Sequence, residues 1–211
     1  MAAASQLSSD NLRFRLRQAT AEAHKNVETA MALEERCTAL PAYRALLSEL
    51  WGLYAPLEAR LATLQWDSVG IDFPQRTKTP WLQADLTILG ASEFDIEALP
   101  RAVDLPSIQC LADGFGALYV LEGASLGGQI IMRRIKSDLG LDQRTGARFF
   151  SSYGADVGER WRGFVATMTA FGNAEDRVQA MERAALATFD SFLLWLGDRP
   201  TISNEGSYHA W

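Results

Sequence analysis

Apolar residues recur along most of this chain with the spacing of amphipathic helices. From Asp10 they follow one another at steps of three and four, and the same pattern returns from Thr38 onward. We predict a first helix over 10–30 and a second over 38–64, with Pro56 kinking or interrupting the second. No segment carries a convincing strand hairpin pattern, so the fold class is all-α.

The second half of the chain continues the helical pattern. Thr79 and Pro80 are expected to act as the cap and first residue of a helix. Residues 1–9 and 198–211 are expected to form irregular tails. We therefore predict one all-α domain over 1–211 with seven or eight helices, the later ones lying over 81–89, 107–139, 156–171 and 174–196.

Composition and charge narrow the class of protein. The chain is 48% apolar and 22% charged, as is ordinary for a soluble globular protein. Its net charge of -6 argues against a nucleic-acid backbone as partner, because no basic stripe replaces the counterions. No secretory signal is evident, no segment approaches the apolar length of a membrane span, and Cys37 and Cys110 form no CxxC pair. We expect a cytoplasmic protein with no membrane partner.

Histidine chemistry has few options, because His24 and His209 are the only histidines. His24 lies at the margin of the first helix's apolar stripe, and Glu28 follows it by one turn. One interpretation is a partly buried histidine with a backbone or carboxylate partner. The other is an axial ligand to haem iron. His209 lies in the polar tail, and two histidines cannot supply the Glu-x-x-His pairs of a dimetal bundle.

Three glycines interrupt a stretch that otherwise favours a buried helix, "LYVLEGASLGGQII" over 118–131. Gly123, Gly127 and Gly128 each cost such a helix roughly 1 kcal/mol relative to alanine. A phosphate loop is disfavoured, because no strand precedes the segment and the Lys-Ser/Thr pair is missing. Close packing between helices and close approach of a flat ligand both remain open on spacing alone.

Two motifs, taken in order, resemble the haem oxygenase family and its bacterial members above all. "RLRQATAEAH" in the first helix carries a basic residue, an Ala-Thr pair and a histidine, and the glycine segment carries a glycine, three residues and then Gly-Gly-Gln. The all-α pattern and the segment from Arg148 to Phe164 also fit, so the resemblance covers most of the chain.

The resemblance implies haem b held between the first helix and a kinked, glycine-containing distal helix. It implies oxidative opening of that haem to biliverdin, CO and ferrous iron, with O2 and electrons from an external donor. His24 becomes the axial ligand to the haem iron, and the catalytic positions are Gly123, Gly127 and Ser125. The cofactor-binding positions that it implies are Arg17, Glu28, Tyr119, Gly128, Arg133 and Arg162.

One departure from the family pattern affects the expected activity. Animal members carry an aspartate after the first glycine, whereas this chain has Ala124. A haem carrier or sensor without ring opening is therefore an alternative, and a cysteine-dependent hydrolase of related fold is another. Expected partners are a ferredoxin or reductase, docking near Arg133, Arg134 and Lys136. A biliverdin-accepting photoreceptor of the phytochrome type is a further one.

Overall fold

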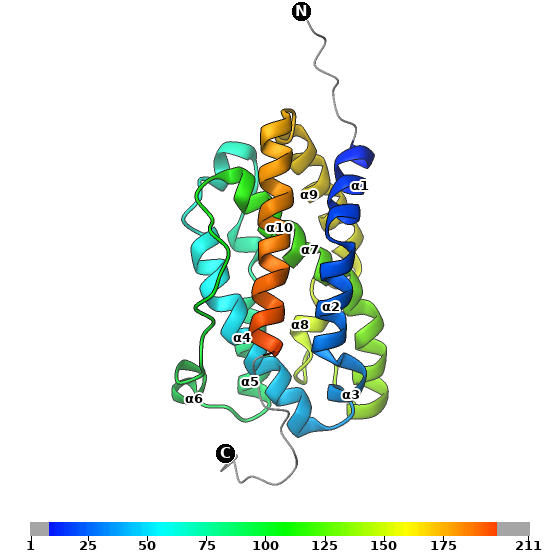
Figure 1. Ribbon diagram of the computed structural model, residues 1–211. Coiled ribbons are helices and arrows are strands. Elements are labelled where there is room, and N and C mark those ends of the chain that lie inside the picture. Colours follow the sequence, from blue (N-terminus) through cyan, green and yellow to red (C-terminus); the bar gives the residue numbers. More distant parts are fainter. Residues whose placement is uncertain (1–8, 198–211) are drawn as a thin grey trace, which may run out of the picture.

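A computed structural model describes residues 9–197 as an elongated bundle of helices (Figure 1). Seven of its α-helices have ten residues or more, and residues 9–197 contain no strand, which confirms the all-α prediction. The α-helices are α1 (Ser9–Ala19), α2 (Ala21–Met31), α3 (Leu33–Arg36), α4 (Leu40–Leu61), α5 (Thr79–Ile88), α6 (Glu93–Glu97), α7 (Leu111–Arg134), α8 (Arg148–Ser151), α9 (Val157–Phe171) and α10 (Glu175–Gly197). The shorter turns are η1 (Trp66–Val69), η2 (Pro74–Arg76), η3 (Ile135–Leu139) and η4 (Gly154–Asp156).

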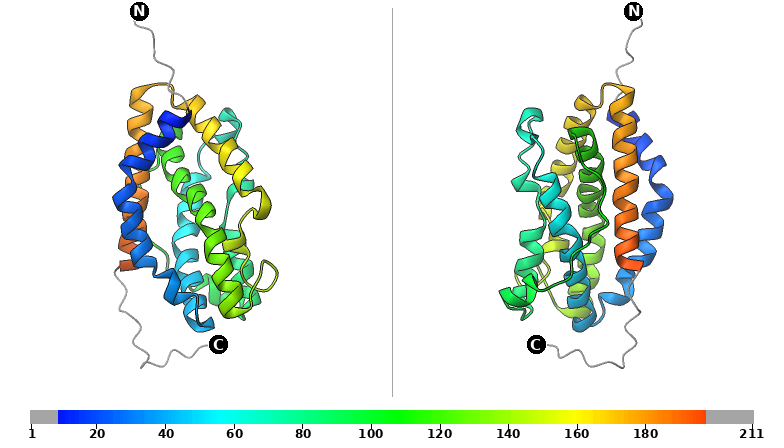
Figure 2. Two further views of the ribbon diagram at one scale, coloured as in Figure 1. Left: turned by 90° about the vertical axis from the view of Figure 1, so that its right-hand side faces the viewer. Right: turned by 60° about the vertical axis from the view of Figure 1, so that its left-hand side comes forward.

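The centre of the bundle is the pair α7 and α10, which pack along each other. Helices α1 and α2 follow one another along one flank of α10, and α4 with α5 forms the opposite side of the molecule (Figures 1 and 2). Aromatic side chains such as Tyr54, Phe115 and Phe192 fill the core between these helices. Helix α10 thus contacts both α2, which carries His24, and α7, which carries the glycines.

The stretch Leu111–Leu139 is long and apolar enough to cross a membrane by length and composition, contrary to the expectation that no segment approaches that length. Half of the residues in the most apolar 18-residue part of this stretch are buried inside the protein. A central core helix has this composition for the same reason as a membrane span, because apolar neighbours surround it.

The first predicted helix is divided into α1 and α2 at Thr20. The Thr20 hydroxyl is buried and donates a hydrogen bond to the carbonyl oxygen of Leu16, at 2.8 Å. Such back-bonding from threonine tends to bend a helix. His24 therefore lies on a separate segment from Arg17, one turn after the break.

Helix α4 runs through Pro56 without interruption, so the expected break there is wrong. Proline removes the hydrogen bond that the carbonyl of Gly52 would accept within the helix. The N–H of Ala102 supplies that bond from outside at 3.0 Å. The connector between α6 and α7 thereby lies against α4, and a Cβ at position 52 would collide with the Pro100 carbonyl oxygen.

Two helices begin at carboxylates contributed by other helices. Thr79 does not cap α5 as expected, since the Glu58 carboxylate of α4 accepts the N–H groups of Lys78 and Thr79 at 2.6 and 3.0 Å. In the same way the Asp85 carboxylate of α5 accepts the first two N–H groups of α8, at 2.7 and 2.8 Å. A carboxylate satisfies the unpaired amides of a helix start better than a threonine hydroxyl.

Candidate functional site

His24 presents its imidazole to the surface of α2, with 56% of the side chain exposed. Its Nδ1 is 3.4 Å from Oε2 of Glu28, the contact expected from the sequence. Its ring also packs edge-on against Phe189 of α10, with the ring centroids 5.7 Å apart. A carboxylate beside Nδ1 favours one ring orientation and leaves Nε2 as the nitrogen for a ligand.

Helix α7 is helical through all three glycines, so they do not interrupt it. The departure from α geometry comes after them, in the π-helical turn Ile135–Leu139. Glycine lowers helix propensity without forcing a break, and packing against α8, α9 and α10 holds the segment helical.

The three glycines have different surroundings. A Cβ at Gly128 would lie 2.6 Å from the carbonyl oxygen of Phe150, so this glycine allows α7 to approach α8. A Cβ at Gly127 would have no atom within 4 Å, and one at Gly123 would only touch the Trp161 ring at 3.9 Å. Packing therefore accounts for Gly128, whereas Gly123 and Gly127 leave bare backbone beside open space.

Ser125 does not share the face of Gly123 and Gly127. Each residue advances about 100° around an α-helix, so Ser125 is about 200° from both glycines. Its side chain is buried, as is Gly128 three residues later. This geometry does not favour the expected position of Ser125 beside the bound oxygen. Ala124, between Gly123 and Ser125, is exposed.

Tyr119 of α7 and Arg17 of α1, both expected to contact haem propionates, lie within electrostatic range of each other. Burial raises the pKa of Tyr119, and the positive charge of Arg13, the nearby Thr20 hydroxyl and the positive charge of Arg17 oppose that shift. The Tyr119 ring also contacts the Trp161 ring of α9, with centroids 5.6 Å apart. The N-terminal half of α7 thus has a phenol beside two guanidinium groups.

Arg133 and Arg162 are exposed on α7 and α9. Neither forms an ion pair within residues 9–197. Both arginines are available to an anionic group, but neither contacts Arg17 or Tyr119 within residues 9–197. His209 lies outside the described residues.

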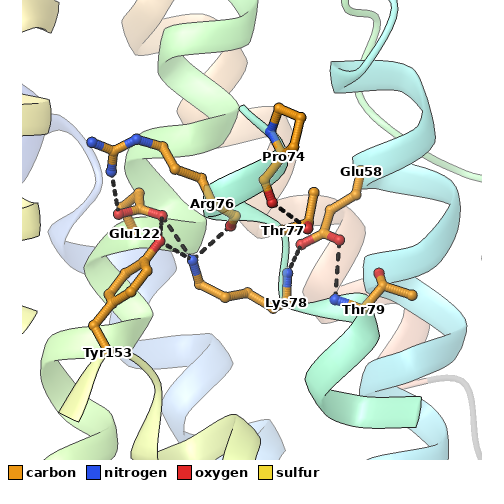
Figure 3. Close-up of polar contacts among 8 residues, drawn as sticks. All are labelled: Glu58, Pro74, Arg76, Thr77, Lys78, Thr79, Glu122 and Tyr153. Atoms are coloured by element: carbon orange, nitrogen blue, oxygen red, sulfur yellow. Dashed lines mark hydrogen bonds and ion pairs between the residues drawn. The ribbon is translucent and has the colours of Figure 1, made fainter. Parts of the chain in front are cut away.

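Sequence reasoning missed a buried ionic cluster directly before Gly123 (Figure 3). The Glu122 carboxylate accepts hydrogen bonds from Arg76, Lys78 and Tyr153, each at 2.8 Å. Lys78 also donates to the Tyr153 hydroxyl at 2.6 Å and to the carbonyl of Arg76 at 2.7 Å. Burial lowers the pKa of Lys78, and the charge of Glu122 opposes that shift. An acid among apolar residues was the available signal.

This cluster fixes α7 beside the glycines. Glu122 and Lys78 each have only 2% of their surface exposed. One buried carboxylate joins α7 to the connector before α5 and to the loop after α8. Removing either partner would leave a buried charge uncompensated, so the segment carrying Gly123 is held at a defined position.

The surroundings of His24 and of Gly123 and Gly127 fit a haem. An exposed imidazole offers a nitrogen donor to iron, and Cβ-free positions with open space allow a flat macrocycle to approach a helix backbone. Arg17 and Tyr119 can pair with carboxylates at the edge of such a ring.

Comparison with known proteins shows which family and which folds this chain resembles. The "Heme oxygenase" family model matches residues 10–198. The NO- and CO-bound heme oxygenase from Neisseria meningitidis has a similar fold, with a TM-score of 0.75 and 19% identity over 88% of this chain and 89% of that one. Heme oxygenase from Leptospira interrogans gives a TM-score of 0.70 and 17% identity over 89% and 99% of the two chains.

A search among curated protein sequences found no match. The two solved structures show the fold, and the family model spans nearly all of the described residues. This chain belongs to the haem oxygenase family.

Proposed function

We propose that this protein is a cytoplasmic haem oxygenase that opens haem b to biliverdin, CO and ferrous iron, using O2 and an external electron donor. The proposal rests on two observations, an exposed imidazole at His24 on α2 and bare backbone beside open space at Gly123 and Gly127 on α7. A helix with bulky side chains at those two positions could not lie against a haem face.

In this proposal the chain supplies binding, orientation and hydrogen bonding, while bound haem supplies the oxygen chemistry. His24 binds the iron through Nε2, and Glu28 orients the imidazole through Nδ1. Arg17 and Tyr119 hold propionates, which fixes the rotation of the ring in its plane. Arg133 and Arg162 are further candidates for that contact.

Proton supply is the step for which the side chains differ from the expected pattern. Ala124 offers no acid, and Ser125 is buried on another face of α7. We propose that water held by the backbone at Gly123 and Gly127 delivers protons, because the open space beside Gly127 admits it.

The test is to add hemin to the purified protein, record the Soret band, and then supply ascorbate in air. Conversion to a biliverdin spectrum with release of CO supports the proposal. His24→Ala should lose axial ligation and most turnover, and added imidazole should restore part of both. Lys25→Ala is the matched control, since Lys25 is the exposed neighbour of His24 on α2. Normal axial ligation in His24→Ala would refute the assignment.

A haem carrier or sensor is the second candidate, and Ala124 in place of an acid favours it. In the same assay it would give a stable ferrous haem spectrum and no biliverdin. Electrons would come from a ferredoxin or a reductase. The exposed cations Arg133, Arg134 and Lys136 offer a docking surface for an acidic donor. Transfer of biliverdin to a phytochrome-type photoreceptor is the proposed fate of the product.

A further inference from the structure

A hollow is lined by residues other than His24 and the three glycines. Its volume is about 570 Å3, within the usual range for small-molecule sites. The connector before α5, the start of α5 and the segment from Gln143 to Arg160 form its walls. None of its lining residues belongs to α1, α2 or α7, so the proposed haem site contributes nothing to it.

Two guanidinium groups give this hollow a positive character. Arg148 lies over the Trp81 ring at 5.2 Å, and Arg160 lies 5.4 Å from the centroid of the Tyr153 ring. Within residues 9–197 neither forms a salt bridge, and Asp156 is the only acid among the lining residues. Stacking on an aromatic ring holds a guanidinium in a fixed plane, which suits a bidentate contact with a carboxylate.

The neighbouring acids are already engaged elsewhere. The Asp85 carboxylate accepts the backbone amides of Arg148 and Phe149, and Glu122 is occupied by Arg76, Lys78 and Tyr153. Figure 3 shows the Tyr153 hydroxyl directed toward Glu122. Arg160 also donates a hydrogen bond to Oε1 of Gln75 at 3.2 Å. With Asp156 as the one acid among the lining residues, the two guanidinium groups leave the wall of the hollow with a charge of +1.

Ser152 adds an unsatisfied polar group to the wall. Its hydroxyl is buried without a hydrogen-bond partner, and the residue is only 2% exposed. Its backbone has φ 49° and ψ -125°, a conformation that non-glycine residues rarely adopt. Buried hydroxyls are normally hydrogen-bonded, so an unpaired one in the wall that also carries Arg148 and Arg160 indicates a missing acceptor.

We propose that this hollow, which we call the arginine pocket, binds a small organic carboxylate with a flat apolar body. The carboxylate pairs with Arg148 and Arg160, and the body lies against Trp81 and the rings of Pro74 and Pro80. The rings of Trp81, Pro74 and Pro80 favour such an acid over inorganic phosphate, and the arginines favour it over a neutral molecule of the same shape.

Titration of the ¹⁵N-labelled full chain with sodium benzoate tests the proposal. The indole N–H signal of Trp81, assigned by its loss in Trp81→Phe, should shift and saturate. Benzyl alcohol and inorganic phosphate should each bind at least about tenfold more weakly, because each lacks one half of the recognition. An equal response to either compound would overturn the proposal.

Substitutions in the wall provide a second measurement. Arg148→Gln and Arg160→Gln should each weaken benzoate binding by about tenfold or more. Arg183→Gln, an exposed arginine of α10 outside the arginine pocket, should leave it unchanged. Ser152→Ala removes no existing hydrogen bond, so it should keep the melting temperature and weaken binding by about two- to tenfold. Unchanged affinity in all three wall variants would refute the proposal.

Haem is itself a flat carboxylic acid, so a third experiment separates the two sites. Protein loaded with one equivalent of hemin should bind benzoate as the haem-free protein does. Loss of benzoate binding on loading would show that haem occupies the arginine pocket, which would overturn the inference. The benzoate titration of haem-free protein does not depend on haem turnover, so the two proposals fail independently.

Discussion

Replacing Gly127 and Gly128 separately by alanine distinguishes the two faces of α7. Both variants gain about 1 kcal/mol of helix propensity, since alanine replaces glycine inside a helix. At Gly127 the new methyl group meets no atom within 4 Å, so this gain remains. We expect Gly127→Ala to be more stable than the parent chain in the absence of haem.

At Gly128 the methyl group would meet the carbonyl oxygen of Phe150 at 2.6 Å, which is 0.8 Å closer than an ordinary contact of 3.4 Å. The oxygen belongs to the backbone and cannot rotate away. Overpacking of this kind costs about 1–3 kcal/mol. Since the propensity gain is the same in both variants, they should differ by about 1–3 kcal/mol. At about 2–4 °C per kcal/mol this is a difference of about 2–12 °C in melting temperature.

Thermal unfolding followed by circular dichroism measures this difference on the haem-free proteins. In the haem-dependent assay Gly127→Ala should be less active than the parent chain although it is more stable, because the added methyl group fills the space proposed for the ring. Ascorbate-supported biliverdin formation should then fall by about tenfold or more. Equal melting temperatures for the two variants would refute the packing argument. Undiminished turnover in Gly127→Ala would refute the placement of haem beside it.

Three further predictions concern buried ionisable groups. Glu122→Gln leaves the buried cations Arg76 and Lys78 without their carboxylate. The free energy of unfolding should fall by about 3–5 kcal/mol and the melting temperature by about 6–20 °C. A shift below about 2 °C would contradict a stabilising role of these ion pairs. Burial raises the pKa of Asp85 from 3.8 to about 6, so the folded protein favours the protonated carboxyl. The contribution of this group to the free energy of unfolding is therefore complete below pH 3.8 and is lost as the pH rises through 6. That loss is about 3 kcal/mol, and the difference in urea unfolding between the parent chain and Asp85→Asn should change by this amount between pH 4 and 7. Burial raises the pKa of the Cys37 thiol to about 11, whereas Cys110 is exposed, so mass spectrometry should find iodoacetamide on Cys110 long before Cys37.

Periodicity predicted the helices well, because apolar spacing reports which face of a helix is buried. The segments from Val157 to Phe171 and from Glu175 to Gly197 agree with it closely. It failed at Pro56, where the bond that proline removes from α4 is replaced by the distant N–H of Ala102. A rule about one residue and its helical neighbours does not include a donor 46 positions away.

In the candidate site, the sequence predicted the contact within one helix but not the contacts between helices. His24 and Glu28 are neighbours on one helix, so their contact follows from spacing. The separate surroundings of Gly127 and Gly128 depend on where α8 lies, which their local sequence does not specify. The Glu122 cluster was missed because its partners come from two segments far from α7 in the sequence, although an acid inside an apolar stretch already indicated a buried partner.

The carboxylate caps of α5 and α8 have a consequence for how the chain can be divided. Helix α5 begins at an acid carried by α4, and α8 begins at an acid carried by α5. Each start therefore has its capping carboxylate only while the preceding helix is in place. A fragment beginning after α4 would lack the cap of α5, so the chain cannot be divided between these helices without leaving the Lys78 and Thr79 amides unpaired.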